Sequence, residues 1–193
     1  MNYLAHLFLS CQDDDLMIGN FIADSIRNKE VADYAPSIQQ GIFLHRKIDS
    51  YTDTHPIVKQ GTRRLYPQHG KYAPVVVDIF FDNLLANNWA KYASESLSNF
   101  AHRMYQTLLD RQLDLPVKMQ VYVPSMIEND WLQKYGTWEG LQYTFERMDR
   151  RTKFPSNFSN AVQHLQADYA LFNEEFNLFF PDVLEMVADF CGC

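Results

Sequence analysis

Apolar residues recur at intervals of three and four positions along most of this chain, which is the spacing of one buried face of an α-helix. The longest series ends before Pro181 and consists of Phe158, Val162, Leu165, Tyr169, Phe172 and Phe176. Similar series occupy residues 97–108 and 141–148, and Pro74 suits the first turn of a further helix. The two-residue alternation typical of strands is weak throughout. The pattern therefore predicts an all-α fold.

Composition favours one helical domain over a many-turned β architecture. The 193 residues include only 7 glycines and 8 prolines, and 47% of them are hydrophobic. Sparse turn residues suit long helices, and a chain of this length can bury roughly 70% of its unfolded surface in one core. No internal repeat or flexible linker divides the sequence. We therefore expect a single-domain helical bundle over residues 1–193.

Charge and hydropathy exclude several classes of function. With 17 basic and 24 acidic side chains the net charge is −7, which argues against a general nucleic-acid-binding protein. No apolar run approaches the roughly 18–20 residues of a membrane span. The first residues also lack the basic region and cleavage site of a secretory signal. We therefore predict a cytoplasmic protein with no nucleic-acid or membrane partner, whose oligomeric state the sequence leaves unknown.

Two groups of residues receive no function from the sequence. Three cysteines at uneven spacing do not form a disulfide framework, and we expect free thiols at Cys11, Cys191 and Cys193. Four histidines lie in polar contexts and are expected to be solvated: His55, His69, His102 and His164.

Ionisable residues interrupt two segments that otherwise have the pattern of buried helix faces. His45 and Asp49 are one helical turn apart in the first segment, and Asp78 and Asp82 have the same spacing in the second. Carboxylates four residues apart repel by roughly 0.2–0.5 kcal/mol on an exposed helix, and by more where water is excluded. A basic side chain from another helix or a bound cation must compensate this repulsion.

Two further ionisable residues lie within apolar segments near the N-terminus. They complete the set His6, Asp24, His45, Asp49, Asp78 and Asp82. Two imidazoles and four carboxylates form a ligand set for Mn²⁺, Mg²⁺ or Fe²⁺ rather than a thiolate zinc site. The alternative is structural, because core histidines and ion-paired acids also occur in folded proteins. Each unpaired burial is costly, so the spacing leaves a metal centre and a structural network both open.

Five stretches in this order and spacing, with a later basic segment, resemble the acyl carrier protein phosphodiesterase (ACP hydrolase) family. The stretches are MNYLAHL (1–7), GNFIAD (19–24), GIFLHRKID (41–49), TD (52–53) and DIFFD (78–82), and the basic segment is RMDRR (147–151). This resemblance implies an α-helical fold related to the HD-domain phosphohydrolases. It also implies that Mn²⁺ or Mg²⁺ supports removal of 4′-phosphopantetheine from the serine of holo-acyl carrier protein, leaving the apo form.

The resemblance also suggests roles for individual residues. We expect Asp24, His45 and Asp78 to bind the metal, and Asp82 and Asp49 to complete the ligand shell or orient water. Asp24 and Asp49 are thus candidate catalytic residues as well. His6 is a candidate acid for the leaving serine oxygen. Arg46 is a candidate clamp for the phosphate. A purely structural role, in a salt bridge to Asp49 or Asp53, fits the sequence equally well.

The sequence departs from the family after Asp82, where a histidine is common and this chain has Asn83. Asparagine cannot transfer a proton and is a poor metal ligand. Activity is therefore in doubt if residue 83 takes part in the chemistry, and is unaffected if it only supports a ligand. We favour a supporting role, in which Asn83 donates a hydrogen bond to a ligand carboxylate.

A basic patch is expected where this acidic protein would dock an acyl carrier protein. An acyl carrier protein is acidic, so a partner of charge −7 needs a local basic patch, and the predicted patch consists of Arg147, Arg150 and Arg151. A solvated helix end is the other interpretation of these arginines.

One alternative function is an HD-like phosphohydrolase of nucleotides or small phosphate esters, which an aromatic-walled pocket would favour. The other is a non-catalytic helical binding protein on the same scaffold.

Overall fold

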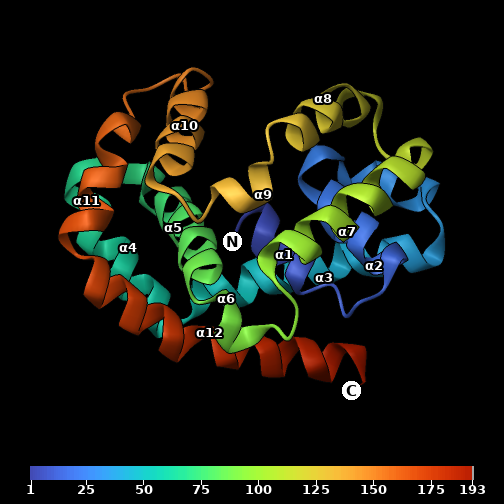
Figure 1. The fold of residues 1–193 in the computed structure, drawn as a ribbon, viewed down its shortest axis with the longest axis horizontal. Helices are drawn as coiled ribbons and strands as arrows, with labels where there is room; N and C mark the ends of the chain where they lie inside the picture. The colour runs from blue at the N-terminus through green and yellow to red at the C-terminus, as the bar shows by residue number, and fades with distance from the viewer. Residues whose placement is uncertain (193) are drawn as a thin grey trace.

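The computed structural model describes residues 1–192, which form α-helices and short 3-10 turns with no strand among them (Figure 1). The prediction of an all-α fold is therefore confirmed. The helices are α1 (Tyr3–Phe8), α2 (Asp14–Ile22), α3 (Pro36–Thr54), α4 (Pro56–His69), α5 (Ala73–Asn87), α6 (Trp89–Tyr92), α7 (Leu97–Asp110), α8 (Val117–Glu128), α9 (Trp131–Lys134), α10 (Trp138–Asp149), α11 (Ala161–Ala167) and α12 (Tyr169–Cys191). None of these helices is both long and apolar enough to cross a membrane.

Local chemistry explains where several helices begin. The side chain of Asp13 accepts a hydrogen bond from the Leu16 amide and caps α2, as an acidic residue at a helix start should. Pro74 lies in the first turn of α5, as predicted, where its missing N–H costs nothing. The predicted end before Pro181 is wrong, because α12 continues through this proline. Phe180 before this proline and Val183 after it are fully buried, so packing keeps this part of the helix in place.

Helix α12 runs along one edge of the molecule and packs against α3, α4 and α5 (Figure 1). Its aromatic residues meet those of α5 in the core, where Phe81 contacts Phe176 and Phe179 at ring-centroid distances of 5.5 and 5.2 Å. Cys191, near its end, forms a disulfide with Cys11 after α1.

This disulfide corrects the expectation of free thiols. Cys11 and Cys191 are 180 residues apart in sequence but their Cα atoms are 6.2 Å apart, because α12 returns to the N-terminal helices. Residue spacing alone could not reveal that proximity. Cys193, the remaining cysteine, lies outside the described residues.

Helices α2 and α3 cross at very short range through two glycines. A Cβ atom on Gly19 would lie 2.0 Å from the Ile38 carbonyl oxygen and 2.7 Å from the Gly41 Cα. Only glycine permits such an approach of two backbones. The crossing brings the residues that follow Gly19 on α2 beside the middle of α3.

Candidate active site

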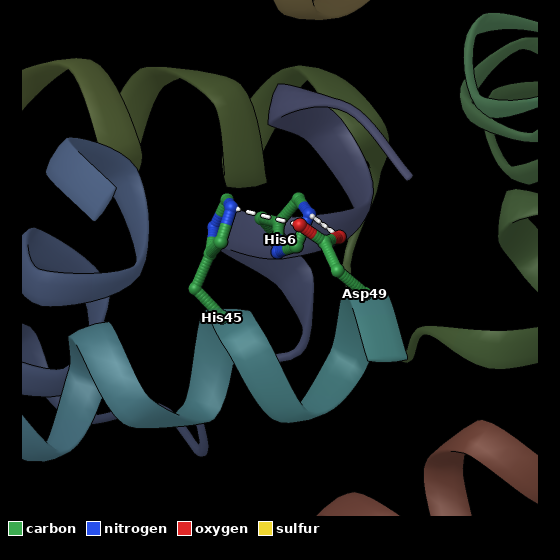
Figure 2. A group of neighbouring side chains, drawn as sticks. All are labelled: His6, His45 and Asp49. Atoms are coloured by element: carbon green, nitrogen blue, oxygen red, sulfur yellow. Dashed lines mark ion pairs between the residues drawn. The ribbon is translucent and has the colours of Figure 1, made fainter. Parts of the chain in front are cut away.

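Three of the predicted residues form a compact cluster between α1 and α3. His6 comes from α1, and His45 and Asp49 come from successive turns of α3; their side chains point toward one another (Figure 2). Asp49 lies 3.1 Å from the Nε2 atom of His6 and 3.1 Å from the Nε2 atom of His45. The two imidazole rings stack at 3.9 Å. One ligand atom from each residue lies within 4.8 Å of the others, which is close enough for one cation to contact all three.

Asn20 sets the orientation of both rings. The Nδ1 atom of His6 is 2.8 Å from the Asn20 side-chain oxygen, and the Nδ1 atom of His45 is 2.9 Å from the Asn20 carbonyl oxygen. Both of these oxygens are acceptors, so each Nδ1 carries a proton and donates it. In the neutral rings the lone pairs are then on the two Nε2 atoms, which face Asp49.

Asn20 itself is held rigidly, and the sequence analysis did not assign it a role. Its amide donates to the His6 carbonyl oxygen at 2.7 Å and to the Ser10 hydroxyl at 3.1 Å, so its oxygen is left facing the imidazoles. The residue is almost completely buried. The available signal was a polar residue within the apolar stretch 19–24, the same signal that identified Asp24.

Asp24 approaches the cluster from the solvent side. It lies in the 3-10 turn η1 (Ala23–Ser25) that follows α2, and its carboxylate is 3.2 Å from the Nε2 atom of His45. Its side chain is 83% exposed, whereas those of His6 and His45 are 4% and 7% exposed. Asp24 is therefore the acid of this group that a substrate in solution can reach most directly.

Burial and charge act in opposite directions on the two imidazoles. Burial lowers the pKa of His6, and the nearby His45 adds to this effect. Burial also works to lower the pKa of His45, but the hydrogen bonds and charges of Asp24 and Asp49 outweigh it and raise that pKa to about 9. Burial works to raise the pKa of Asp49, but the hydrogen bond from His45 and the nearby His6 and Met1 ammonium outweigh it and lower that pKa. Without a bound cation the cluster therefore holds its proton on His45.

The donor set fits a divalent metal. The Nε2 atom of His6 is buried and makes no hydrogen bond, although the Asp49 oxygen is only 3.1 Å away. An unprotonated nitrogen beside a carboxylate oxygen suits a shared cation better than a direct hydrogen bond. His6, His45, Asp49 and the exposed Asp24 are the residues that can hold such an ion. The structure thus groups His6 with other candidate ligands, as the ionisable set in the sequence had suggested, and its role as an acid for the leaving oxygen stays a prediction.

Asp78 lies at the margin of this cluster. Its carboxylate accepts a hydrogen bond from the Met1 ammonium at 2.9 Å, and that ammonium is 3.8 Å from Asp49. Burial opposes the charge on Met1, but Asp78 and Asp49 outweigh it and raise the pKa of the amine. The cation needed beside Asp78 is therefore supplied by the chain itself.

Asp82 is separated from the cluster. It is completely buried and accepts backbone N–H bonds from Asn2, Leu4 and Ala5, so it anchors the start of α1. Burial raises its pKa to about 7 against the opposing effects of the Met1 ammonium and these N–H groups. The expectation that Asp82 completes a metal shell is thus replaced by a role in positioning the helix that carries His6.

Asn83 also points away from the cluster. Its amide donates to the Tyr135 carbonyl oxygen at 2.6 Å, which joins α5 to the segment after α9. The expected hydrogen bond to a ligand carboxylate is not formed. The Asn83 side chain therefore supports the packing of α5 rather than the orientation of His6, His45 or Asp49.

The remaining predicted cations lie outside the cluster. Arg46 is exposed and donates to the Asn28 side chain at 2.9 Å, so it forms neither of the expected salt bridges. Arg147 lies over the Trp131 ring at 4.1 Å, and Arg150 is exposed at the end of α10. Arg147 and Arg151 line a cavity of about 200 Å³ with several aromatic side chains.

The four histidines expected to be solvated have different surroundings. His102 is exposed, and His55 lies 3.2 Å from Asp182. His69 is instead buried. Its Nδ1 atom donates a hydrogen bond to the Ser156 carbonyl oxygen, and its Nε2 atom lies 2.9 Å from the Nδ1 atom of His164. The expectation is therefore wrong for His69, whose partners are 87 and 95 residues away in sequence.

Comparison with known proteins gives a consistent result over nearly the whole chain. A family model described as acyl carrier protein phosphodiesterase matches residues 1–183. A protein of that name from Photorhabdus laumondii is 31% identical over 186 residues, which cover 96% of this chain and 94% of the relative. Proteins of the same name from Yersinia enterocolitica and Salmonella newport are each 27% identical over at least 97% of this chain and 98% of their own length. No solved structure matches the chain.

Proposed function

The chain belongs to the acyl carrier protein phosphodiesterase family of hydrolases, and from this premise we propose that it uses a divalent metal to convert holo-acyl carrier protein to the apo form. The bond cleaved joins 4′-phosphopantetheine to a serine of the carrier protein, and water supplies the new oxygen on phosphorus. The convergence of His6, His45 and Asp49 on one point is the observation that supports a metal-assisted reaction most directly.

Mn²⁺ or Mg²⁺ held by these three residues with Asp24 would neutralise phosphate charge and lower the pKa of attacking water from about 15.7 toward 7. The protein residues have separate tasks. Asn20 keeps both Nε2 atoms directed inward. Asp24, exposed at the rim, is the group best placed to orient the attacking water, and Asp49 would balance part of the charge of the ion.

A group of arginines at the end of α10 suits an acidic carrier protein. Arg147, Arg150 and Arg151 lie at the end of α10, in a chain whose overall charge of −7 would otherwise slow association with an acidic partner. We assign them to docking. Since Arg147 and Arg151 also line the aromatic cavity, Arg150→Glu tests docking separately. We expect a loss of several-fold in kcat/KM for holo-acyl carrier protein that grows smaller as salt is added.

An aromatic-walled cavity is the one observation that favours the second candidate, a phosphohydrolase of nucleotides or other small phosphate esters. The two candidates differ in substrate and can be compared directly by offering holo-acyl carrier protein and a nucleotide phosphodiester to the same preparation. Metal analysis of the purified protein tests the third possibility, a binding protein without turnover.

The deciding experiment is incubation with holo-acyl carrier protein and Mn²⁺, followed by mass spectrometry of the carrier protein. We expect loss of the complete phosphopantetheine group, no reaction in excess EDTA, and no reaction with Asp49→Asn. Full activity in EDTA with no bound metal would contradict the metal mechanism, and activity on the nucleotide alone would favour the second candidate.

A further inference from the structure

A cavity near the cluster is lined by aromatic side chains from four helices. Its walls include Tyr3 on α1, Tyr122 on α8, Trp131 on α9, and Tyr143 with Arg147 on α10. Its volume of about 200 Å³ suits part of a small molecule or a flexible chain rather than a protein segment. Aromatic walls with a few polar groups are the usual composition of a small-molecule site.

Helix α1 contributes residues to both the cavity and the His6–His45–Asp49 cluster. Tyr3 precedes His6 by three residues on α1, which is a rise of about 4.5 Å along the helix. The Tyr3 hydroxyl is 3.1 Å from that of Tyr122, and both residues line the cavity. A phosphate at the cluster can therefore extend an attached chain past Tyr3 into the cavity.

We propose, on the basis of the proposed function, that this cavity binds the pantetheine arm of the substrate. Beyond its phosphate the arm is uncharged and carries two methyl groups, a hydroxyl, two amides and methylene units. Aromatic walls suit the methyl and methylene groups, and the tyrosine hydroxyls suit the amides.

The arrangement of Trp131 favours such an arm over a nucleotide base. Its ring already lies under the Arg147 guanidinium at 4.1 Å and parallel to the Tyr122 ring at 6.2 Å. A base needs a free aromatic face on which to stack, whereas an extended chain needs only the edges and hydroxyls that line the cavity. The cavity thus contributes to recognition of this particular phosphodiester, while the cluster carries out its cleavage.

Binding is tested without any reaction by titrating pantetheine, which has no phosphate, into the full-length protein in a calorimeter. We expect saturable binding that weakens about tenfold in Thr144→Phe, whose larger side chain fills the cavity. Tyr66→Ala serves as the matched control, because it removes an exposed tyrosine that is outside the cavity lining. Binding of adenosine monophosphate in place of pantetheine would overturn the assignment.

Kinetics supply the second measurement. In Thr144→Phe we expect KM for holo-acyl carrier protein to rise about tenfold, with a much smaller change for a small phosphodiester that lacks the arm. An equal loss on both substrates would show that the position serves the fold or the metal site, and would overturn the proposal. If Thr144→Phe fails to fold, Tyr143→Ala on the exposed rim replaces it.

The two hypotheses fail separately. Cleavage of holo-acyl carrier protein by a protein that binds no pantetheine would refute the cavity assignment and keep the proposed function. Pantetheine binding without cleavage of holo-acyl carrier protein would refute the proposed function and keep the cavity as a pantetheine site.

Discussion

The protein contains two pairs of histidines, and their surroundings give them opposite chemistry. His6 and His45 stack at 3.9 Å beside two carboxylates, whereas His69 and His164 meet edge to face at 5.0 Å with a backbone carbonyl as their other partner. In the first pair both Nδ1 atoms are bound by Asn20, so both Nε2 atoms face the acids and both have lone pairs for a cation once His45 loses its proton. In the second pair the Nε2 atom of His69 accepts from the Nδ1–H of His164.

The difference lies in what happens to the nitrogen lone pairs. A pair that uses one ring's lone pair for the other ring's N–H is satisfied internally and stabilises the fold. A pair whose lone pairs converge with carboxylates has unused capacity for a cation. Two imidazoles in contact are therefore not by themselves evidence of a metal site, and the surrounding acceptors decide.

The largest expected difference is in turnover. His45→Ala should reduce kcat/KM on holo-acyl carrier protein by about 10²–10⁴, because it removes a group that holds the metal or protons at the reacting site. His69→Ala, the matched control, should keep turnover within about twofold while lowering stability by about 1–3 kcal/mol through lost hydrogen bonds. Circular dichroism and thermal melts accompany both. Comparable turnover losses, or an unfolded His45→Ala, would remove the distinction between the pairs.

Metal binding should strengthen with rising pH as His45 loses its proton. Its pKa is raised to about 9 from 6.5, so in the metal-free protein its proton stabilises the fold fully below pH 6.5. That contribution, on the order of 3 kcal/mol, is lost as pH rises through 9. Because a metal must displace this proton, the rise in melting temperature caused by Mn²⁺ should grow between pH 6.5 and 9. It should survive His69→Ala and disappear in Asp49→Asn. A shift independent of pH would argue against His45 as a ligand.

The smallest effect should come from the outer member of the second pair. His164→Ala leaves His69 buried without one of its two partners, at a cost of about 0.5–1.5 kcal/mol in unfolding free energy. Turnover and the Mn²⁺ effect should not change. Chemical denaturation with and without Mn²⁺ measures both, and any loss of metal binding would show that the two pairs are coupled.

The sequence by itself determined the helices and one half of the site. Helical periodicity is a local property, and it placed His45 and Asp49 on one face of α3 before any tertiary contact was known. It also identified His6 and Asp24 as polar residues within apolar segments. The family resemblance, carried by motifs in residues 1–151, agrees with a family match over residues 1–183. The relation to HD-domain phosphohydrolases, the metal and the catalytic roles stay predictions.

Only the tertiary structure decided which polar residues meet. Asp78 and Asp82 have the same four-residue spacing as His45 and Asp49, yet Asp82 lies against the backbone amides of α1 and Asp78 against the Met1 ammonium. The disulfide of Cys11 and the partners of His69 likewise come from more than 80 residues away. Periodicity fixes the face of a helix on which a side chain lies. The close crossing of α2 and α3 at Gly19 and Gly41 fixes which other helix that face meets, because interhelical distance depends on packing that no local pattern encodes.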